Sequence, residues 1–169
     1  VIDDGTIPGA LGSRPFDAEG LPVRKKAVVE KGELKNYLLD TYSGKKLGMA
    51  STGNASRSVG EPPGVSPTNF YWVPGKDSPE QIVGSVKSGL YVTEMIGFGV
   101  NMVTGDYSRG ASGFWVENGQ IAYPVQEITI AGNLRDMYKG IEAVGADAYN
   151  YGAKTVGSVL INRMKVAGS

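Results

Sequence analysis

The side chains that could do chemistry in this chain are hydroxyls, carboxylates and lysines, because none of its 169 residues is His or Cys. A Ser-His-Asp triad and a Cys-His pair are therefore excluded within the chain. Carboxylates without His or Cys suit hard ions such as Mg²⁺ and Ca²⁺, which argues against a zinc site. We predict that the chain contains no catalytic residue and no metal ligand.

Two short groups of residues could still take part in catalysis or ion binding. Ser43 is close in sequence to Lys45 and Lys46, and a desolvated lysine can activate a hydroxyl. This stretch is predicted to be exposed, so an independent hydrolase is the hypothesis that we favour least. Asp3 and Asp4 could bind a hard cation, but adjacent carboxylates point in different directions. We therefore predict that both carboxylates are solvated.

Two polar stretches in the first half of the chain are predicted peptide contacts. Asp40 and Tyr42 could present a peptide-binding edge, although a helix cap is the simpler interpretation of Asp40. Thr52 and Asn54 lie in a Ser-Thr-Gly-Asn stretch whose N–H groups could form an anion-binding nest. That stretch lacks the Gly-Lys-Ser/Thr element of a phosphate loop, so a plain loop is the alternative.

Short β-biased runs bounded by turn residues predict about eight strands, many of them joined in hairpins. Two hairpin turns are clear, at Lys31-Gly32 and at Asn118-Gly119, where Gly supplies the positive φ. Residues 51–67 are rich in Ser, Gly and Pro and predict a long loop. The other predicted strands, besides the pair that flanks Asn118-Gly119, cover residues 26–30, 33–39, 69–73, 90–96, 126–131 and 156–166.

Capping signals predict two main helices. Ser78-Pro79-Glu80-Gln81 combines a capping box with Pro at the first helical position, and Gly89 is predicted to end this helix. Asn133 is predicted to cap a second helix that runs from Leu134 to about Val144. Helices do not separate the strands regularly, which disfavours a doubly wound parallel sheet. We predict an α+β fold dominated by mostly antiparallel sheets.

The composition of the chain restricts its possible partners and its cellular compartment. Lys plus Arg and Asp plus Glu both number 17, so the net charge is zero, and we predict no direct contact with nucleic acid. No apolar stretch approaches the roughly 20 residues of a membrane helix, and we predict no membrane association. The absence of Cys suits a reducing compartment and predicts a cytoplasmic protein. Because the chain begins at Val1 rather than Met, we expect residues 1–169 to be a single domain of something longer.

Two stretches of the chain resemble the C-terminal domain of the TldD/PmbA family, once called modulators of DNA gyrase and now regarded as peptidases. The first stretch covers residues 38–48 and continues through Ser51-Thr52-Gly53-Asn54-Ala55. The second is longer and ordered, and its segments are 97–101, 103–114, 117–119, 123–125 and 130–134. The resemblance extends from about Asp3 to Gly168.

This resemblance implies one of two kinds of subunit. A TldD-type subunit carries a His-Glu-x-x-x-His helix and a late Cys that bind the catalytic zinc, whereas a PmbA-type or TldE-type subunit lacks them. The helix lies before this domain, but the Cys is expected near residues 145–152, where this chain has Gly-Ala-Asp-Ala-Tyr-Asn-Tyr-Gly. Residues 109–114 also resemble the PmbA version. The chain is therefore identified as the non-metal type, with zinc expected in the partner subunit.

The glycine-rich part of the second stretch is the predicted functional loop. In the family, two subunits enclose a chamber in which unfolded peptides are cut, and this loop is expected to line the chamber or the subunit interface. The alternative is a structural turn in which Asp106 caps backbone N–H groups and pairs with Arg109. The residues of this predicted loop are Thr104, Gly105, Asp106, Tyr107, Ser108, Arg109 and Gly110.

The resemblance also implies partners. We expect a heterodimer with a TldD-type metal-bearing subunit, or a homodimer, acting on unfolded peptide that could be held as an added strand. The aromatic residues are expected in the core or at a subunit interface rather than stacked on bases, because the net charge is zero. The alternative function is a non-proteolytic interaction module of the gyrase-modulator type.

Overall fold

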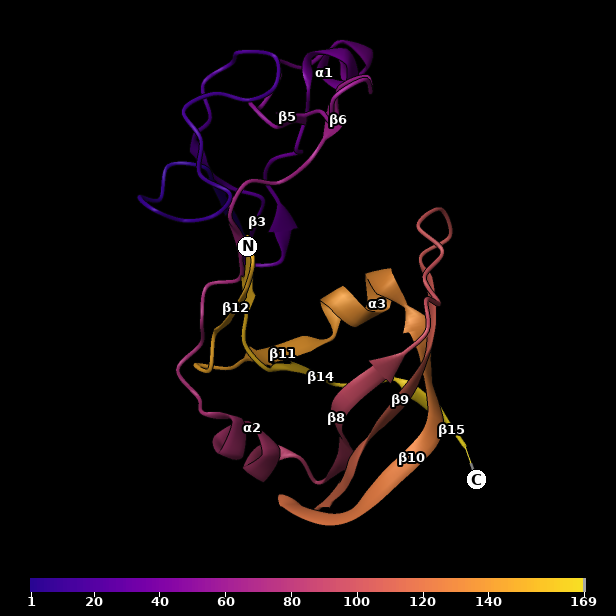
Figure 1. Ribbon diagram of the computed structural model, residues 1–169. Coiled ribbons are helices and arrows are strands. Elements are labelled where there is room, and N and C mark those ends of the chain that lie inside the picture. The colour runs from indigo at the N-terminus through magenta and orange to yellow at the C-terminus, as the bar shows by residue number, and fades with distance from the viewer. Residues whose placement is uncertain (169) are drawn as a thin grey trace. The chain divides into compact units, whose positions relative to one another are not determined.

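Strands that pair antiparallel dominate residues 1–168, the part of the chain that the computed structural model describes (Figure 1). This confirms the predicted α+β fold with mostly antiparallel sheets. The chain divides into two compact units. Unit 1 combines Val1–Val73 with Ala148–Val156, and unit 2 combines Pro74–Asp147 with the segment that begins at Gly157.

Unit 1 is built on a five-stranded sheet that joins the beginning of the chain to a late segment. Its order is β12-β13-β7-β1-β2, and β13 pairs parallel with β7 while the other neighbours are antiparallel. The strands are β1 (Ile2–Asp4), β2 (Lys25–Ala27), β7 (Phe70–Tyr71), β12 (Tyr149–Tyr151) and β13 (Lys154–Val156). A segment 80 or so residues away in sequence therefore completes the first sheet.

Short local elements occupy the rest of unit 1. The predicted hairpin at Lys31-Gly32 is confirmed, with φ of 50° and 80°, but β3 (Val29–Glu30) and β4 (Glu33–Leu34) are shorter than predicted. Helix α1 (Thr41–Leu47) begins at the Asp40 cap, as predicted, and ends at Gly48, which has φ 66°. The long loop predicted over residues 51–67 contains one pair of two-residue strands, β5 (Ala55–Ser56) and β6 (Gly64–Val65).

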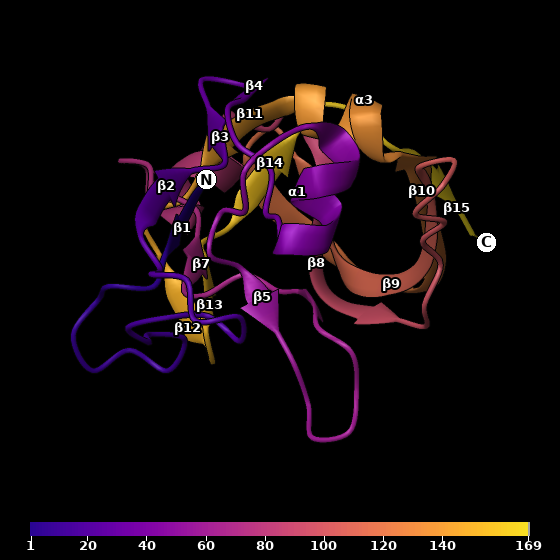
Figure 2. The same ribbon diagram turned by 90° about the horizontal axis from the view of Figure 1, so that it is seen from above.

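Unit 2 contains a curved four-stranded antiparallel sheet in the order β15-β10-β9-β8 (Figure 2). The strands are β8 (Ser88–Ile96), β9 (Asp106–Glu117), β10 (Gln120–Asn133) and β15 (Lys165–Ala167). Register shifts between Val92 and Glu94 and between Val125 and Ile128 insert extra residues, and such bulges bend strands. The predicted Asn118-Gly119 turn joins β9 to β10, with φ of 49° and 78°.

Helix α2 (Pro79–Ser85) has the predicted start but not the predicted end. Ser78 accepts from the Gln81 N–H, and the Gln81 side chain accepts from the Ser78 N–H, which completes the capping box. The helix ends at Ser85, and the prediction that Gly89 ends it was wrong. The carbonyls of Val86 and Lys87 accept N–H groups from the β9–β10 turn, which draws the chain into extended backbone.

The last predicted helix and the last predicted strand were both too long. Helix α3 (Leu134–Lys139) stops at Gly140, and Ile141–Val144 forms β11, paired with β14 (Val159–Ile161). The β-branched ends of β11 fit a sheet better than a helix, and β14 supplies the hydrogen bonds. The predicted strand over 156–166 is interrupted, so its residues lie in parts of β13, β14 and β15.

The two units are stabilised differently. Unit 2 has an apolar core of Ala111, Ile128 and Ile130, against which Leu90, Val92, Tyr107, Val125 and Met164 pack. All the buried polar or charged residues of the described chain lie in unit 1, namely Asp3, Asp4, Asp17, Lys26, Asp40, Thr52, Asn54, Thr68 and Asn69. None of the helices in residues 1–168 has the length and apolar character that crossing a bilayer requires.

Candidate functional site

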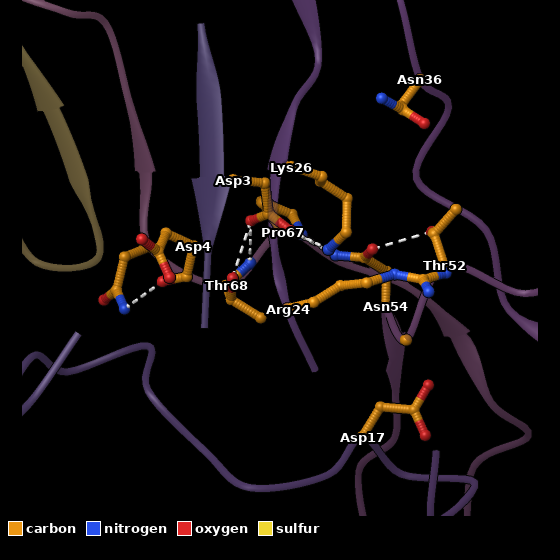
Figure 3. Close-up of polar contacts among 12 residues, drawn as sticks. Asp3, Asp4, Asp17, Arg24, Lys26, Asn36, Thr52, Asn54, Pro67 and Thr68 are labelled. Atoms are coloured by element: carbon orange, nitrogen blue, oxygen red, sulfur yellow. Dashed lines mark hydrogen bonds and ion pairs between the residues drawn. The ribbon is translucent and has the colours of Figure 1, made fainter. Parts of the chain in front are cut away.

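A buried carboxylate, Asp3, organises the polar interior of unit 1 (Figure 3). The antiparallel register of β1 and β2 places Asp3 opposite Lys26, whose Nζ lies 2.9 Å from Asp3 Oδ2. The same oxygen accepts from Asn54 Nδ2 at 2.8 Å, and Oδ1 accepts from the N–H and hydroxyl of Thr68 at 2.6 and 2.8 Å. Both oxygens of the Asp3 carboxylate therefore accept two hydrogen bonds each, which satisfies the need of a buried charge for hydrogen-bond partners.

Thr52 and Asn54, two of the predicted peptide contacts, belong to this buried network. The Thr52 hydroxyl accepts from the Leu39 N–H at 2.6 Å and lies 2.8 Å from Asn54 Oδ1, to which it donates. Asn54 is 0% exposed and donates to Asp3 and to the Ser66 carbonyl. Both side chains therefore connect loops of unit 1 and do not face solvent.

Asp40 and Tyr42, the other predicted peptide contacts, differ in their accessibility. Asp40 accepts from the N–H and the hydroxyl of Ser43 at the start of α1, and these bonds hold the pKa of Asp40 below its ordinary value. Tyr42 is 66% exposed, and Lys46 Nζ lies 4.6 Å from the centre of its ring. The Ser43 hydroxyl donates to Asp40 Oδ1 and Lys46 faces Tyr42, and among the described residues no hydrogen bond joins Lys45 or Lys46 to Ser43.

The prediction that Asp3 and Asp4 are solvated was wrong. Asp3 is fully buried, and Asp4 is nearly so, accepting from the Thr6 N–H at 2.9 Å and its hydroxyl at 2.6 Å. Within residues 1–168 no three His, Cys, Asp or Glu side chains group as metal ligands. The donors to Asp3 come from positions 23, 51 and 65 residues away, a pairing that no local sequence signal contains.

We predict that the stabilisation by Asp3 depends on pH. Burial alone would raise the pKa of Asp3, but hydrogen bonds from Asn54, Lys26 and Thr68 together hold it below the ordinary value of 3.8. A folded pKa below the unfolded pKa stabilises the protein above the unfolded value, and the stabilisation is lost as the pH falls through the folded value. Urea unfolding of the wild type and Asp3→Asn at about pH 7, 5, 4 and 3 checks this. The stability gap between them should narrow below about pH 4, and an unchanged gap would contradict the prediction.

The predicted functional loop is mainly a strand. Thr104 and Gly105 lie in a turn, but Asp106–Glu117 is strand β9, so the loop prediction is wrong for residues 106–110. Its residues pair with β10 from Asp106 opposite Asn133 to Gly110 opposite Thr129. The glycines that suggested a loop permit close approach of backbones within the sheet.

Asp106 and Arg109 do not pair, contrary to the structural alternative. Asp106 accepts from the Thr104 hydroxyl at 2.7 Å and from Asn133 Nδ2 at 3.4 Å. Arg109 Nη2 is 3.5 Å from the Met95 carbonyl, and Arg109 Nε is buried without a partner within the described chain. Asp106 and Ser108 remain exposed on one face of β9, whereas Tyr107 and Arg109 are half-buried on the other.

The connection between β8 and β9 is a feature that sequence reasoning missed. Residues 97–105, called the hairpin tip, extend beyond both strands (Figure 1). Asn101 orders the hairpin tip, because its Oδ1 accepts from the N–H groups of Val103 at 2.9 Å and Thr104 at 3.2 Å. Phe98, Met102 and Val103 are nevertheless exposed. These three apolar residues stand in a stretch of sequence without charged residues. That pattern was the signal that could have indicated an exposed apolar loop.

Residues 145–152, near which the resemblance places a metal-binding Cys, do not supply a set of zinc ligands. Asp147 Oδ1 and Oδ2 accept from the N–H and hydroxyl of Ser158 at 3.0 and 2.7 Å, bonds that lower the pKa of Asp147. Tyr149–Tyr151 forms the edge strand β12 of unit 1 and contributes phenol and amide groups only. A lone carboxylate engaged by a serine does not supply the three or four ligands that zinc takes.

Comparison with known proteins finds similarity along almost the whole chain. The sequence model of the family described as PmbA/TldA metallopeptidase C-terminal domain matches residues 1–168. A Haemophilus influenzae protein named metalloprotease PmbA homolog is 48% identical over 160 residues, which are 94% of this chain and 34% of that protein. The chain spans about a third of the length of the curated relatives it matches.

Two solved structures extend the likeness to the fold. A Thermotoga maritima protein named for modulation of a DNA gyrase has a TM-score of 0.87 and 38% identity, covering 98% of this chain and 38% of its own. TldE from Thermococcus kodakarensis has a TM-score of 0.86 and 26% identity, covering 99% of this chain and 39% of its own. The arrangement of strands described above is therefore shared with both proteins.

Proposed function

Because this chain belongs to the family of PmbA/TldA metallopeptidase C-terminal domains, we propose that it is part of a non-catalytic subunit. In this proposal the PmbA/TldE-type subunit pairs with a TldD-type subunit that holds the zinc, and the complex processes or degrades unfolded peptides. A homodimer is the arrangement proposed where that partner is missing. The domain contributes to the chamber and to the subunit interface, in the cytoplasm.

The observation that carries this proposal is the lack of zinc ligands in a domain of a metallopeptidase family. None of the 169 residues is His or Cys, and the carboxylate nearest to the expected ligand position, Asp147, is bonded to Ser158. A neutral hydroxyl or amide is a poor replacement for a thiolate or imidazole on zinc. The likeness to TldE supports the same assignment.

A peptide in this proposal binds through its main chain. Strand β8 is an edge of the unit 2 sheet, and edge strands carry N–H and carbonyl groups that can pair with an added strand. Main-chain pairing accepts varied sequences, as processing of unfolded peptides requires. The exposed residues Thr104, Asp106 and Ser108 and the exposed ring of Tyr42 are the proposed polar contacts to peptide or partner.

The test is cleavage of an unstructured peptide by the full-length subunit, by a TldD-type partner and by their mixture, each with zinc. We expect cleavage only in the mixture. Full activity of the partner alone would overturn the need for this subunit. Activity of this subunit alone would overturn its non-catalytic role and direct attention to Ser43, Lys45 and Asp106.

A second function is kept because one solved relative is named for modulation of a DNA gyrase. In this alternative the domain is a non-proteolytic module that binds another protein. The zero net charge disfavours direct binding to DNA. Affinity capture with the full-length subunit distinguishes the two, because recovery of gyrase without a metal-bearing partner would favour the second function.

A further inference from the structure

The turn between β9 and β10 carries a reactive pair of residues, Asn118 and Gly119. It is the only Asn-Gly pair among the 169 residues. The backbone nitrogen that follows an asparagine can attack the carbonyl carbon of the asparagine side chain. Glycine hinders this attack least, because it has no side chain and its backbone rotates freely. The reaction open to this pair is therefore deamidation of Asn118.

Asn118 is exposed, but the nitrogen that must attack it is engaged. The Gly119 N–H donates to the Val86 carbonyl at 2.8 Å, and the Asn118 N–H donates to the Lys87 carbonyl at 2.7 Å. Val86 is the residue that ends helix α2. The nitrogen must lose its proton to attack, and here that proton lies in a hydrogen bond. The end of α2 therefore protects the pair.

The conformation of the turn gives a second form of protection. Asn118 and Gly119 have φ of 49° and 78°, in the left-handed region, and the pairing of Glu117 with Gln120 closes the turn behind them. A Cβ at Gly119 would lie 2.6 Å from the Gly84 carbonyl oxygen, so the turn lies directly against the backbone of α2. The rotation that brings the Gly119 nitrogen to Asn118 Cγ requires the turn to leave α2.

We propose that Asn118 is a site of spontaneous deamidation that becomes reactive only when the turn separates from α2. The Gly119 nitrogen forms a bond to Asn118 Cγ, the bond from Cγ to Nδ2 breaks, and Nδ2 leaves as ammonia with the proton from Gly119. Water then opens the resulting succinimide ring at either carbonyl, which leaves aspartate or isoaspartate at position 118. This goes beyond the proposed function, because it concerns modification of the chain itself.

Neither product fits the closed turn as asparagine does. Isoaspartate lengthens the backbone by one carbon, in a turn whose two-residue length sets the register of β9 and β10. Both products also add a carboxylate beside Glu117, and like charges at this spacing repel. The modification therefore opposes the return of the turn to α2 and marks the copies of the protein in which the two have separated.

The first experiment measures deamidation of the full-length subunit in mildly alkaline buffer, with and without urea. Peptides are mapped by mass spectrometry, with fragmentation that distinguishes isoaspartate from aspartate. In urea, Asn118 should react faster than Asn36, which precedes the bulky Tyr37. In the folded subunit, Asn118 should react at least about tenfold more slowly than in urea. Equal rates with and without urea, or no reaction of Asn118 in urea, would overturn the proposal.

The second experiment changes the stability of α2 without touching the turn. Ser78→Ala removes the cap of α2 and should accelerate deamidation of the folded subunit about fivefold. Gly84→Ala places a better helix former in α2 and should slow it by about two- to fivefold. Asp40→Ala is the matched control, since it removes the cap of α1 in unit 1 and should leave the rate at Asn118 unchanged.

Two outcomes of the second experiment would overturn the proposal. If neither variant of α2 changes the rate at Asn118, the helix does not protect the turn. If Asp40→Ala accelerates the reaction as much as Ser78→Ala, global unfolding and not separation from α2 exposes the pair. Circular dichroism of each variant confirms that it is folded. Neither experiment involves peptide cleavage, so its failure is distinct from failure of the proposed function.

Discussion

Asp3→Asn is expected to lower the free energy of unfolding by about 3–5 kcal/mol, because it leaves a buried ammonium group without its counter-charge. Lys26 is 8% exposed, and its Nζ has its hydrogen bond to the Asp3 carboxylate. An amide at position 3 keeps the shape of the side chain but adds donors where Thr68 and Asn54 also donate. Urea unfolding at neutral pH measures the loss.

Two further variants separate the buried pair from a general effect of charge. Asp77→Asn removes an exposed carboxylate of unit 2 and should change stability by less than about 0.5 kcal/mol. Adding Lys26→Met to Asp3→Asn removes the uncompensated charge and should recover part of the loss. An Asp3→Asn loss below about 1 kcal/mol would mean that water or another group compensates Lys26.

Gly113→Ala is expected to destabilise unit 2 by about 3 kcal/mol or more, at the upper end of overpacking changes. Gly113 is buried in β9, between Val92 of β8 and Val125 of β10. A Cβ at this position would overlap the Tyr91 carbonyl oxygen and lie 3.0 Å from Val92 Cα. Because these neighbours are backbone atoms, only separation of the strands makes room. Thermal unfolding followed by circular dichroism measures the effect.

Gly84→Ala is the control for a glycine without such contacts. Gly84 lies inside α2, and a Cβ there meets no atom within 4 Å. Alanine in a helix is more favourable than glycine by about 0.5–1 kcal/mol, so this variant should be neutral or slightly more stable. Equal losses in both variants would show that close packing at Gly113 is not the cause.

Elements whose hydrogen bonds are local could be predicted from the sequence. The capping box at Ser78 closes within four residues, and the turn at Asn118-Gly119 within two, so neighbouring side chains decide both. The end of α1 at Gly48 follows the same rule. The family resemblance was also confirmed, since it depends on ordered residues and not on packing.

Elements that depend on distant partners could not be predicted. Ile141–Val144 has helical spacing of its apolar residues, but β14 pairs with it from 15 or more residues away. The spacing of the apolar residues alone does not distinguish a helix from a strand. The polar network of unit 1 was missed for a similar reason, because Thr68 and Asn54 reach Asp3 only after the loops have closed.

The predicted site was only partly located by sequence. Asp40 was correctly expected as a helix cap, but burial of Thr52 and Asn54 could not be foreseen from a polar, glycine-containing stretch. Between Thr104 and Gly110 the residue types suggested a turn, yet pairing with the long strand β10 extends the sheet over residues 106–110. The roles of these residues in binding stay predictions.

The interleaved course of the chain has a consequence for the order of events during synthesis. Strand β7 of unit 1 pairs with β13 (Lys154–Val156), which the ribosome makes only after nearly all of unit 2. The first 73 residues therefore wait for their sheet to be completed while the hairpins of unit 2, whose contacts are near in sequence, can already form. A nascent chain stalled before residue 148 should accordingly be cut by added protease within residues 1–73.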